Sequence, residues 1–245
     1  MVNEYFPEEN KYAEPEPILP LGKRIAAFYG RQWQSIKRMK RFVWISAAIY
    51  LLALGAAAAY FFWLFKSPSR SIPSVYNDLF RESGFEEGAW GTFFRILMNN
   101  LNVGFKICLV GLIPFFIPTV FFVVINAGAM SLLLVMMAKL NLPVLKLFST
   151  MIMPHGIIEL PTFVFTAGFS LYISSQMTKR IFKKKAEPTT RSGDLFGTVD
   201  QSDLPDRLTA FGDILQLFAA VILPLTVIAA FLEAFVTPFI YRLIF

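Results

Sequence analysis

One short segment of the sequence combines residue types that could carry chemistry. In Met153-Pro154-His155-Gly156-Ile157-Ile158-Glu159-Leu160-Pro161, a histidine and a carboxylate lie at positions i and i+4 between two prolines. Histidine suits proton transfer because its pKa lies near neutrality. The surrounding sequence is strongly apolar, and an ionisable side chain at membrane depth is costly unless it is paired. We therefore expect His155 and Glu159 to be buried in protein and not to face lipid.

The sequence does not supply the partners that enzymatic chemistry at this segment would need. Serines are present, but none has the context of an activated nucleophile. No glycine-rich phosphate loop is present, and the HxxxE spacing differs from the zinc-binding HExxH pattern. One histidine, one cysteine and carboxylates scattered along the sequence do not supply a metal ligand set. We expect no catalytic residue, no metal, no cofactor and no enzyme activity.

The composition places this segment in a membrane protein. Of the 245 residues, 56% are hydrophobic and 16% are charged. Several apolar runs approach or exceed the length of about 18 residues that is typical of a transmembrane helix. The net charge of +6 sits in two basic clusters beside these runs, so it is a topology signal and not a nucleic-acid signature. We predict an all-α, polytopic membrane helical bundle of about five transmembrane helices, one or two of them re-entrant or broken.

The N-terminal region divides into an acidic and a basic part. Residues 1–21 are rich in glutamate and proline and are predicted to form a disordered cytoplasmic tail. Within residues 22–41, apolar side chains recur at the spacing of an amphipathic helix that lies in the membrane interface. The basic excess predicts a cytoplasmic N-terminus, and both a topology anchor and a regulatory contact to lipid or protein remain open. The basic residues are Lys23, Arg24, Arg31, Lys37, Arg38, Lys40 and Arg41.

Residues 42–245 are predicted to form the membrane domain. Pro114 and Pro118 should kink or break the second span, and Asn126, Gly128 and Ser131 predict a tight turn at the inner face. A rival placement lays residues 91–106 flat in the outer interface. Basic residues open a cytoplasmic loop at 179–209, and the chain beyond residue 232 is expected to be re-entrant or interfacial. The predicted spans lie near residues 42–65, 93–124, 126–139, 157–178 and 210–232.

This topology gathers polar side chains in the outer half of the membrane. The second span carries polar residues at spacings of four, three and four, namely Arg95, Asn99, Asn102 and Lys106, which predicts one polar stripe on a helix. Arg95 is expected to pair with Glu159 or Glu233. We expect the fourth span to begin near Ile158, with Pro161 in its first turn. The cluster either fixes helix register or lines an ion path, a proton path or a ligand site. Its members are Arg95, Asn99, Asn102, Lys106, His155, Glu159 and Glu233, with the backbone-shaping residues Pro154, Gly156, Pro161 and Pro238.

Four segments, in this order, resemble the stage II sporulation protein M family. They are Asn99-Asn100-Leu101, Asn126-Ala127-Gly128, Pro154-His155-Gly156-Ile157-Ile158-Glu159-Leu160-Pro161 and Glu233-Ala234-Phe235-Val236-Thr237-Pro238. The resemblance covers roughly residues 93–178 and 210–240. It implies a multispanning membrane protein without known catalytic machinery. In spore formers it implies a scaffold that recruits peptidoglycan-degrading partners, the stage II sporulation proteins D and P, to the engulfing septum.

The residues and the resemblance together favour a non-enzymatic scaffold of a cell-envelope complex, active in peptidoglycan remodelling or a sporulation-like process. We expect a multi-pass protein of the bacterial cytoplasmic (inner) membrane. The alternative is a membrane subunit of a transporter with a separate ATPase and the polar cluster on its path. The nearly apolar inner half of the predicted spans favours the scaffold. Expected partners are the lipid bilayer, a cell-wall hydrolase-type protein or an ATPase subunit, and a second copy of the chain in a homo-oligomer.

Overall fold

The computed structural model describes residues 20–66, 88–185 and 207–244. These residues form helices and no strand, which confirms the all-α prediction. Five helical stretches are long and apolar enough to cross a membrane, as the sequence predicts. The predicted disordered tail and most of the predicted loop at 179–209 lie outside the described residues. The candidate spans are Ile36–Leu64, Ala89–Val110, Ile117–Lys139, Val144–Phe182 and Ala210–Leu243.

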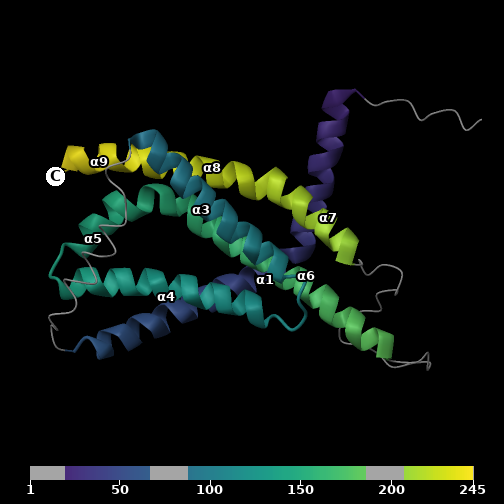
Figure 1. Ribbon diagram of the computed structural model, residues 1–245, viewed down its shortest axis with the longest axis horizontal. Helices are drawn as coiled ribbons and strands as arrows, with labels where there is room; N and C mark the ends of the chain where they lie inside the picture. The colour runs from purple at the N-terminus through teal and green to yellow at the C-terminus, as the bar shows by residue number, and fades with distance from the viewer. Residues whose placement is uncertain (1–19, 67–87, 186–206, 245) are drawn as a thin grey trace, which may run out of the picture.

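The helical stretches lie side by side along the long axis of the molecule (Figure 1). The chain begins with three long helices, α1 (Leu21–Leu64), α3 (Ala89–Val110) and α4 (Ile117–Lys139). A fourth stretch consists of α5 (Val144–Leu147), the π-helix η1 (Phe148–Ile152) and α6 (Met153–Lys185). The last consists of α7 (Arg207–Leu217), η3 (Phe218–Ile222), α8 (Leu223–Phe231), η4 (Leu232–Val236) and α9 (Thr237–Ile244). Helix α6 is central, because it packs against α1, α3 and α8.

The break between the second and third spans lies earlier than predicted. The chain leaves α3 at Gly111 and enters α4 at Ile117, so the predicted span over residues 93–124 is wrong. The turn expected at Asn126, Gly128 and Ser131 is also wrong, because all three lie inside α4. Moving the break gives α4 the length of a complete span, where the sequence predicts a short helix over 126–139.

Side chains of α6 explain why the chain turns at residues 111–116. The backbone N–H groups of Phe115 and Phe116 donate to Thr178 Oγ1 (2.9 Å) and Ser174 Oγ (3.0 Å). The Ser174 hydroxyl in turn donates to the carbonyl of Ile113 at 2.8 Å. Backbone polar groups that a turn frees inside a membrane must be satisfied by protein. A Cβ on Gly111 would lie 2.8 Å from the carbonyl oxygen of Ser170, so this close approach requires glycine.

Helices α1 and α6 cross with their backbones in direct contact. A Cβ built on Gly168 would lie 2.6 Å from Cα of Val43, which leaves room for hydrogen only. The hydroxyl of Ser46 donates to the carbonyl of Val164 at 2.6 Å across the same interface. Small residues at helix contacts and interhelical hydrogen bonds are typical of packing in membranes. This crossing fixes the first span against the helix that carries His155 and Glu159.

The predicted interfacial helix over residues 22–41 and the first span form one continuous helix, α1. From Ile36 onward α1 contacts the core, where Met39 is fully buried. The preceding part runs across the direction of the other helices and leaves the bundle (purple in Figure 1). Its large side chains Ile25, Tyr29 and Trp33 are exposed. We call residues 21–35 the N-terminal arm.

Prolines account for the three π-helical turns. Each π-helix ends two residues before a proline, namely Pro154 after η1, Pro224 after η3 and Pro238 after η4. Inside an α-helix, a proline ring clashes with the carbonyl four residues earlier. That carbonyl belongs in each case to the central residue of the π-helix, where the wider turn moves it away from the ring. The segment beyond residue 232 therefore continues as helix to Ile244 and does not fold back as a re-entrant piece (Figure 1). Its interfacial position stays a prediction.

A candidate polar site inside the membrane bundle

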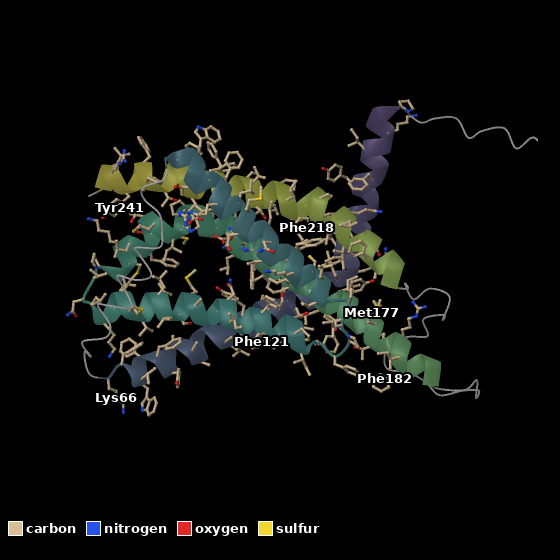
Figure 2. The ribbon with its side chains drawn as sticks, viewed as in Figure 1. Lys66, Phe121, Met177, Phe182, Phe218 and Tyr241 are labelled. Carbon is tan, nitrogen blue, oxygen red and sulfur yellow. The ribbon has the colours of Figure 1, made fainter. Side chains whose placement is uncertain are left out.

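Three helical segments bring the predicted ionisable residues together. Helix α6 begins at Met153 and not near Ile158, so His155 and Glu159 share one helical face and Pro161 is inside the helix. Glu233 comes from the π-helix η4, and Arg95 comes from α3. Both η4 and α3 pack against α6. Figure 2 shows nitrogen and oxygen atoms gathered where these helices meet, toward the end of the bundle that carries Tyr241.

The carboxylate of Glu159 is the centre of this cluster. Its Oε1 accepts a hydrogen bond from Asn100 Nδ2 at 3.1 Å, and its Oε2 lies 3.9 Å from His155 Nε2. Donor atoms of His155, Glu159 and Glu233 all lie within 4.8 Å of one another. The sequence indicates scattered carboxylates and therefore no metal ligand set, but two of these carboxylates and the histidine are neighbours in space.

A polar cavity of about 420 Å³ adjoins the cluster. Glu159, Glu233 and Arg95, which the sequence predicts to lie near one another, all line it. Two negative charges and one positive charge in a membrane interior are costly to bury, and they must be balanced by partners within the protein or by bound ions. The remaining lining residues are Ile96, Asn99 and Asn100.

The predicted polar stripe on α3 divides between two environments. Arg95 and Asn99 line the cavity, whereas Asn102 and Lys106 are exposed and absent from its lining. The cavity side of α3 instead follows Ile96, Asn100 and Val103, one position further along the helix. Asn100 is therefore a site residue that the sequence pattern did not single out. The available signals were its position next to Asn99 and its place in the segment that resembles the family.

A second cavity, of about 120 Å³, extends the polar surface along α6. It shares Asn99, Asn100 and Glu159 with the first and continues to Thr166 and Thr226. The sequence indicates an almost apolar inner half, but α6 carries hydroxyl side chains at every fourth position in this region. Most of them hydrogen-bond to backbone carbonyls or to the turn before α4, so they also serve packing. These residues are Thr162, Thr166, Ser170, Ser174 and Thr178.

Comparison with known proteins identifies the family. Residues 31–238 match the family described as stage II sporulation protein M. The chain belongs to the stage II sporulation protein M family. An uncharacterized protein of Methanocaldococcus jannaschii is 32% identical over 146 residues, which cover 60% of this chain and 71% of that protein. No solved structure matches the chain.

The match to the stage II sporulation protein M family extends beyond the stretches on which the sequence resemblance rests. It begins in the N-terminal arm and ends in α9, so it includes α1 from residue 31 onward and the whole polar cluster. Five spans and this membership identify a multi-pass membrane protein of the family.

The prolines and the glycine of the family segment shape the backbone around the cluster. Pro154 and Pro238 follow the π-helices η1 and η4, and the latter presents Glu233. Pro161 has no N–H, so the carbonyl of Ile157 lacks its usual helical partner. A Cβ on Gly156 would meet only Ile152 at an ordinary 3.6 Å, so space alone does not require glycine there.

The predicted membrane-surface residues lie far from the cluster along the bundle. The N-terminal arm is at the end that carries Phe182, opposite Lys66 and Tyr241 (Figures 1 and 2). Arg24 and Arg31 have side chains outside the described set. The basic residues of α1 with described side chains are exposed, and these are Lys23, Lys37, Arg38, Lys40 and Arg41.

Proposed function

We propose that this member of the stage II sporulation protein M family is a non-enzymatic scaffold that recruits proteins to an envelope complex. The observation that carries the proposal is the N-terminal arm, a helical surface that the bundle does not use. Tyr29 and Trp33 are 52% and 58% exposed, next to the exposed cation Lys37. Aromatic residues are enriched at protein interfaces, and a basic helix also binds an anionic membrane surface.

The positions of the charges support a cytoplasmic place for the arm. The basic end of α6, with Lys179 and Arg180, lies at the same end of the bundle as the arm (Figure 1). Basic residues beside spans are enriched on the cytoplasmic side. A cytoplasmic arm suits an ATPase subunit as partner. The segment between α1 and α3 would then lie on the other side of the membrane, where it could contact envelope proteins such as cell-wall hydrolases.

Site-specific photocrosslinking in cells tests the recruitment role. A photoreactive residue in place of Trp33 should yield a covalent adduct with a distinct protein that is accessible from the cytoplasm, such as an ATPase subunit. The matched control is Trp44, which is 68% exposed inside the first span and should react with lipid. If the Trp33 position labels lipid alone, as the Trp44 position should, the arm is a membrane anchor. The arm would then no longer support the proposed scaffold role.

The polar cavities favour a second candidate, the membrane subunit of a transporter. They join the ionisable cluster to Thr166 and Thr226 along one side of α6, a longer polar surface than the sequence indicates. Ion flux should then depend on Glu159. In proteoliposomes under an imposed potential, proton or cation flux that disappears in Glu159→Gln but persists in Asp213→Asn would support transport. Equal, background flux in all three proteins would contradict ion transport by the chain alone.

A further inference from the structure

We propose that His155, Glu159 and Glu233 bind a divalent transition-metal ion, with zinc as the best match. The proposal goes beyond partner recruitment and does not depend on it. The three side chains come from α6 and η4, and their donor atoms lie within 4.8 Å of one another. One imidazole and two carboxylates form a ligand set that zinc accepts, with a fourth position left open.

The spacing of the donors fits a site that closes around the ion. Two ligands held at about 2.1 Å by a tetrahedral ion lie roughly 3.4 Å apart. The observed spacings of 3.9 Å for His155–Glu159 and at most 4.8 Å for the whole set are therefore somewhat wide. Rotation of the two glutamate side chains closes such a gap. The i, i+4 spacing on α6 keeps His155 and Glu159 on one face throughout.

A buried, unpartnered atom of His155 points independently to a ligand. His155 Nδ1 is buried and has no hydrogen-bond partner among the residues that the structure describes, and the side chain as a whole is 14% exposed. A buried polar atom without a partner costs free energy. Nε2 is the nitrogen that faces Glu159, so a rotation of the imidazole ring that brings Nδ1 to the ion would satisfy this atom by metal coordination. The distance of 3.9 Å between His155 Nε2 and Glu159 Oε2 is also longer than a charge-assisted hydrogen bond, which is about 2.7–2.9 Å.

The net charge of the cavity lining and the hydrogen bond from Asn100 also suit a metal. Among the residues that line the larger cavity, Glu159 and Glu233 contribute two negative charges and Arg95 one positive charge, a sum of −1. A divalent ion with one anionic ligand from solvent in its open position neutralises this sum. Asn100 holds Oε1 of Glu159 and leaves Oε2 facing His155, as expected of an outer residue that orients a ligand.

Calorimetric titration of the full-length protein in detergent, after removal of metals by chelation, tests the proposal with Zn²⁺ as the probe. The wild type should bind one Zn²⁺ per chain. Each of His155→Gln, Glu159→Gln and Glu233→Gln should weaken binding by more than about 100-fold, and Asn100→Ala by about tenfold. Asp213→Asn is the matched control, because Asp213 is another carboxylate on a described helix and lies outside both cavities.

The titration of the wild-type protein can by itself overturn the proposal. Absence of saturable Zn²⁺ and Mn²⁺ binding would overturn the proposal. Equal losses in Asp213→Asn and in the three ligand variants would also overturn it, since binding would then not belong to this site. Size-exclusion chromatography of each variant verifies that it is folded. If Glu233→Gln or Glu159→Gln fails to fold, the corresponding aspartate variant, Glu233→Asp or Glu159→Asp, replaces it, because the shorter side chain should weaken Zn²⁺ binding without removing charge.

Discussion

Asn100 Nδ2 donates a hydrogen bond to Glu159 Oε1 at 3.1 Å and so joins α3 to α6 inside the bundle. The two residues are 59 positions apart in the sequence. A partly buried carboxylate oxygen inside the bundle gains from a donor, and a neutral amide supplies one without adding charge. The bond also orients Glu159, because it leaves the other oxygen on the side of His155.

Asn100→Ala should therefore destabilise the protein. The change leaves Oε1 of Glu159 without this donor, and for a partly buried hydrogen bond the loss is about 0.5–1.5 kcal/mol. Asn102→Ala is the control, because Asn102 is exposed on the same helix and should change stability by less than about 0.5 kcal/mol. Chemical or thermal unfolding in detergent measures both. Equal effects of the two changes would show that the Asn100–Glu159 bond contributes nothing specific.

Gly168→Ala should force α1 and α6 apart. The new Cβ would lie 2.6 Å from Cα of Val43, a backbone atom that cannot move alone. Overpacking of this kind costs about 1–3 kcal/mol. Gly55→Ala is the matched change in α1, where nothing lies within 4 Å of the added atom, and it should be neutral or slightly stabilising. An unfolding midpoint for Gly168→Ala equal to that of the wild type would contradict the close crossing.

Ser174→Ala should weaken the turn between α3 and α4. The hydroxyl accepts from the N–H of Phe116 and donates to the carbonyl of Ile113, and both groups lose their partner in the variant. We expect a loss of about 1–3 kcal/mol in the free energy of unfolding. The neighbouring Ser175→Ala serves as control, since Ser175 is also buried but has no part in the turn contacts described above. Protease sensitivity at residues 111–116 should rise in the first variant only.

Exchanging charges across the larger cavity should reveal the partner of Arg95. Arg95→Glu alone places three carboxylates in one cavity and should reduce the yield of folded protein. Adding Glu233→Arg, or alternatively Glu159→Arg, restores the original charge balance. Recovery of folded, monodisperse protein in one double variant identifies the pair. Failure of both double variants would mean that Arg95 does not balance either carboxylate.

Cysteine labelling should establish the orientation of the spans. In a Cys108→Ala background, a cysteine at Ser83 lies between the first two spans and one at Ser192 lies between the last two. With a cytoplasmic N-terminus, an impermeant reagent added to intact cells should label Ser83→Cys, and Ser192→Cys should react only after lysis. The reverse pattern would place the N-terminal arm outside and exclude the proposed cytoplasmic partner.

The sequence alone determined the class of protein and the number of spans. The length of an apolar run decides whether a helix can cross a membrane, and this is a local property. The HxxxE spacing puts His155 and Glu159 on one helical face only if the helix includes both residues, and the structure decided this because α6 begins at Met153. The prolines were also visible in the sequence, but the sequence did not show whether each of them would end, bend or widen its helix. Pro154, Pro224 and Pro238 follow π-helices, whereas Pro161 is within an α-helix.

Tertiary structure decided where the chain turns and which side chains meet. The turn lies at residues 111–116 and not at Asn126 because Ser174 and Thr178, on another helix, satisfy its backbone. The face of α3 that lines the cavity includes Asn100 and excludes Asn102. Packing against α6 and η4 decides this, because it sets how α3 is rotated about its own axis. The approach of Glu233 to His155 joins residues far apart in sequence, so only the packed bundle places these donors together.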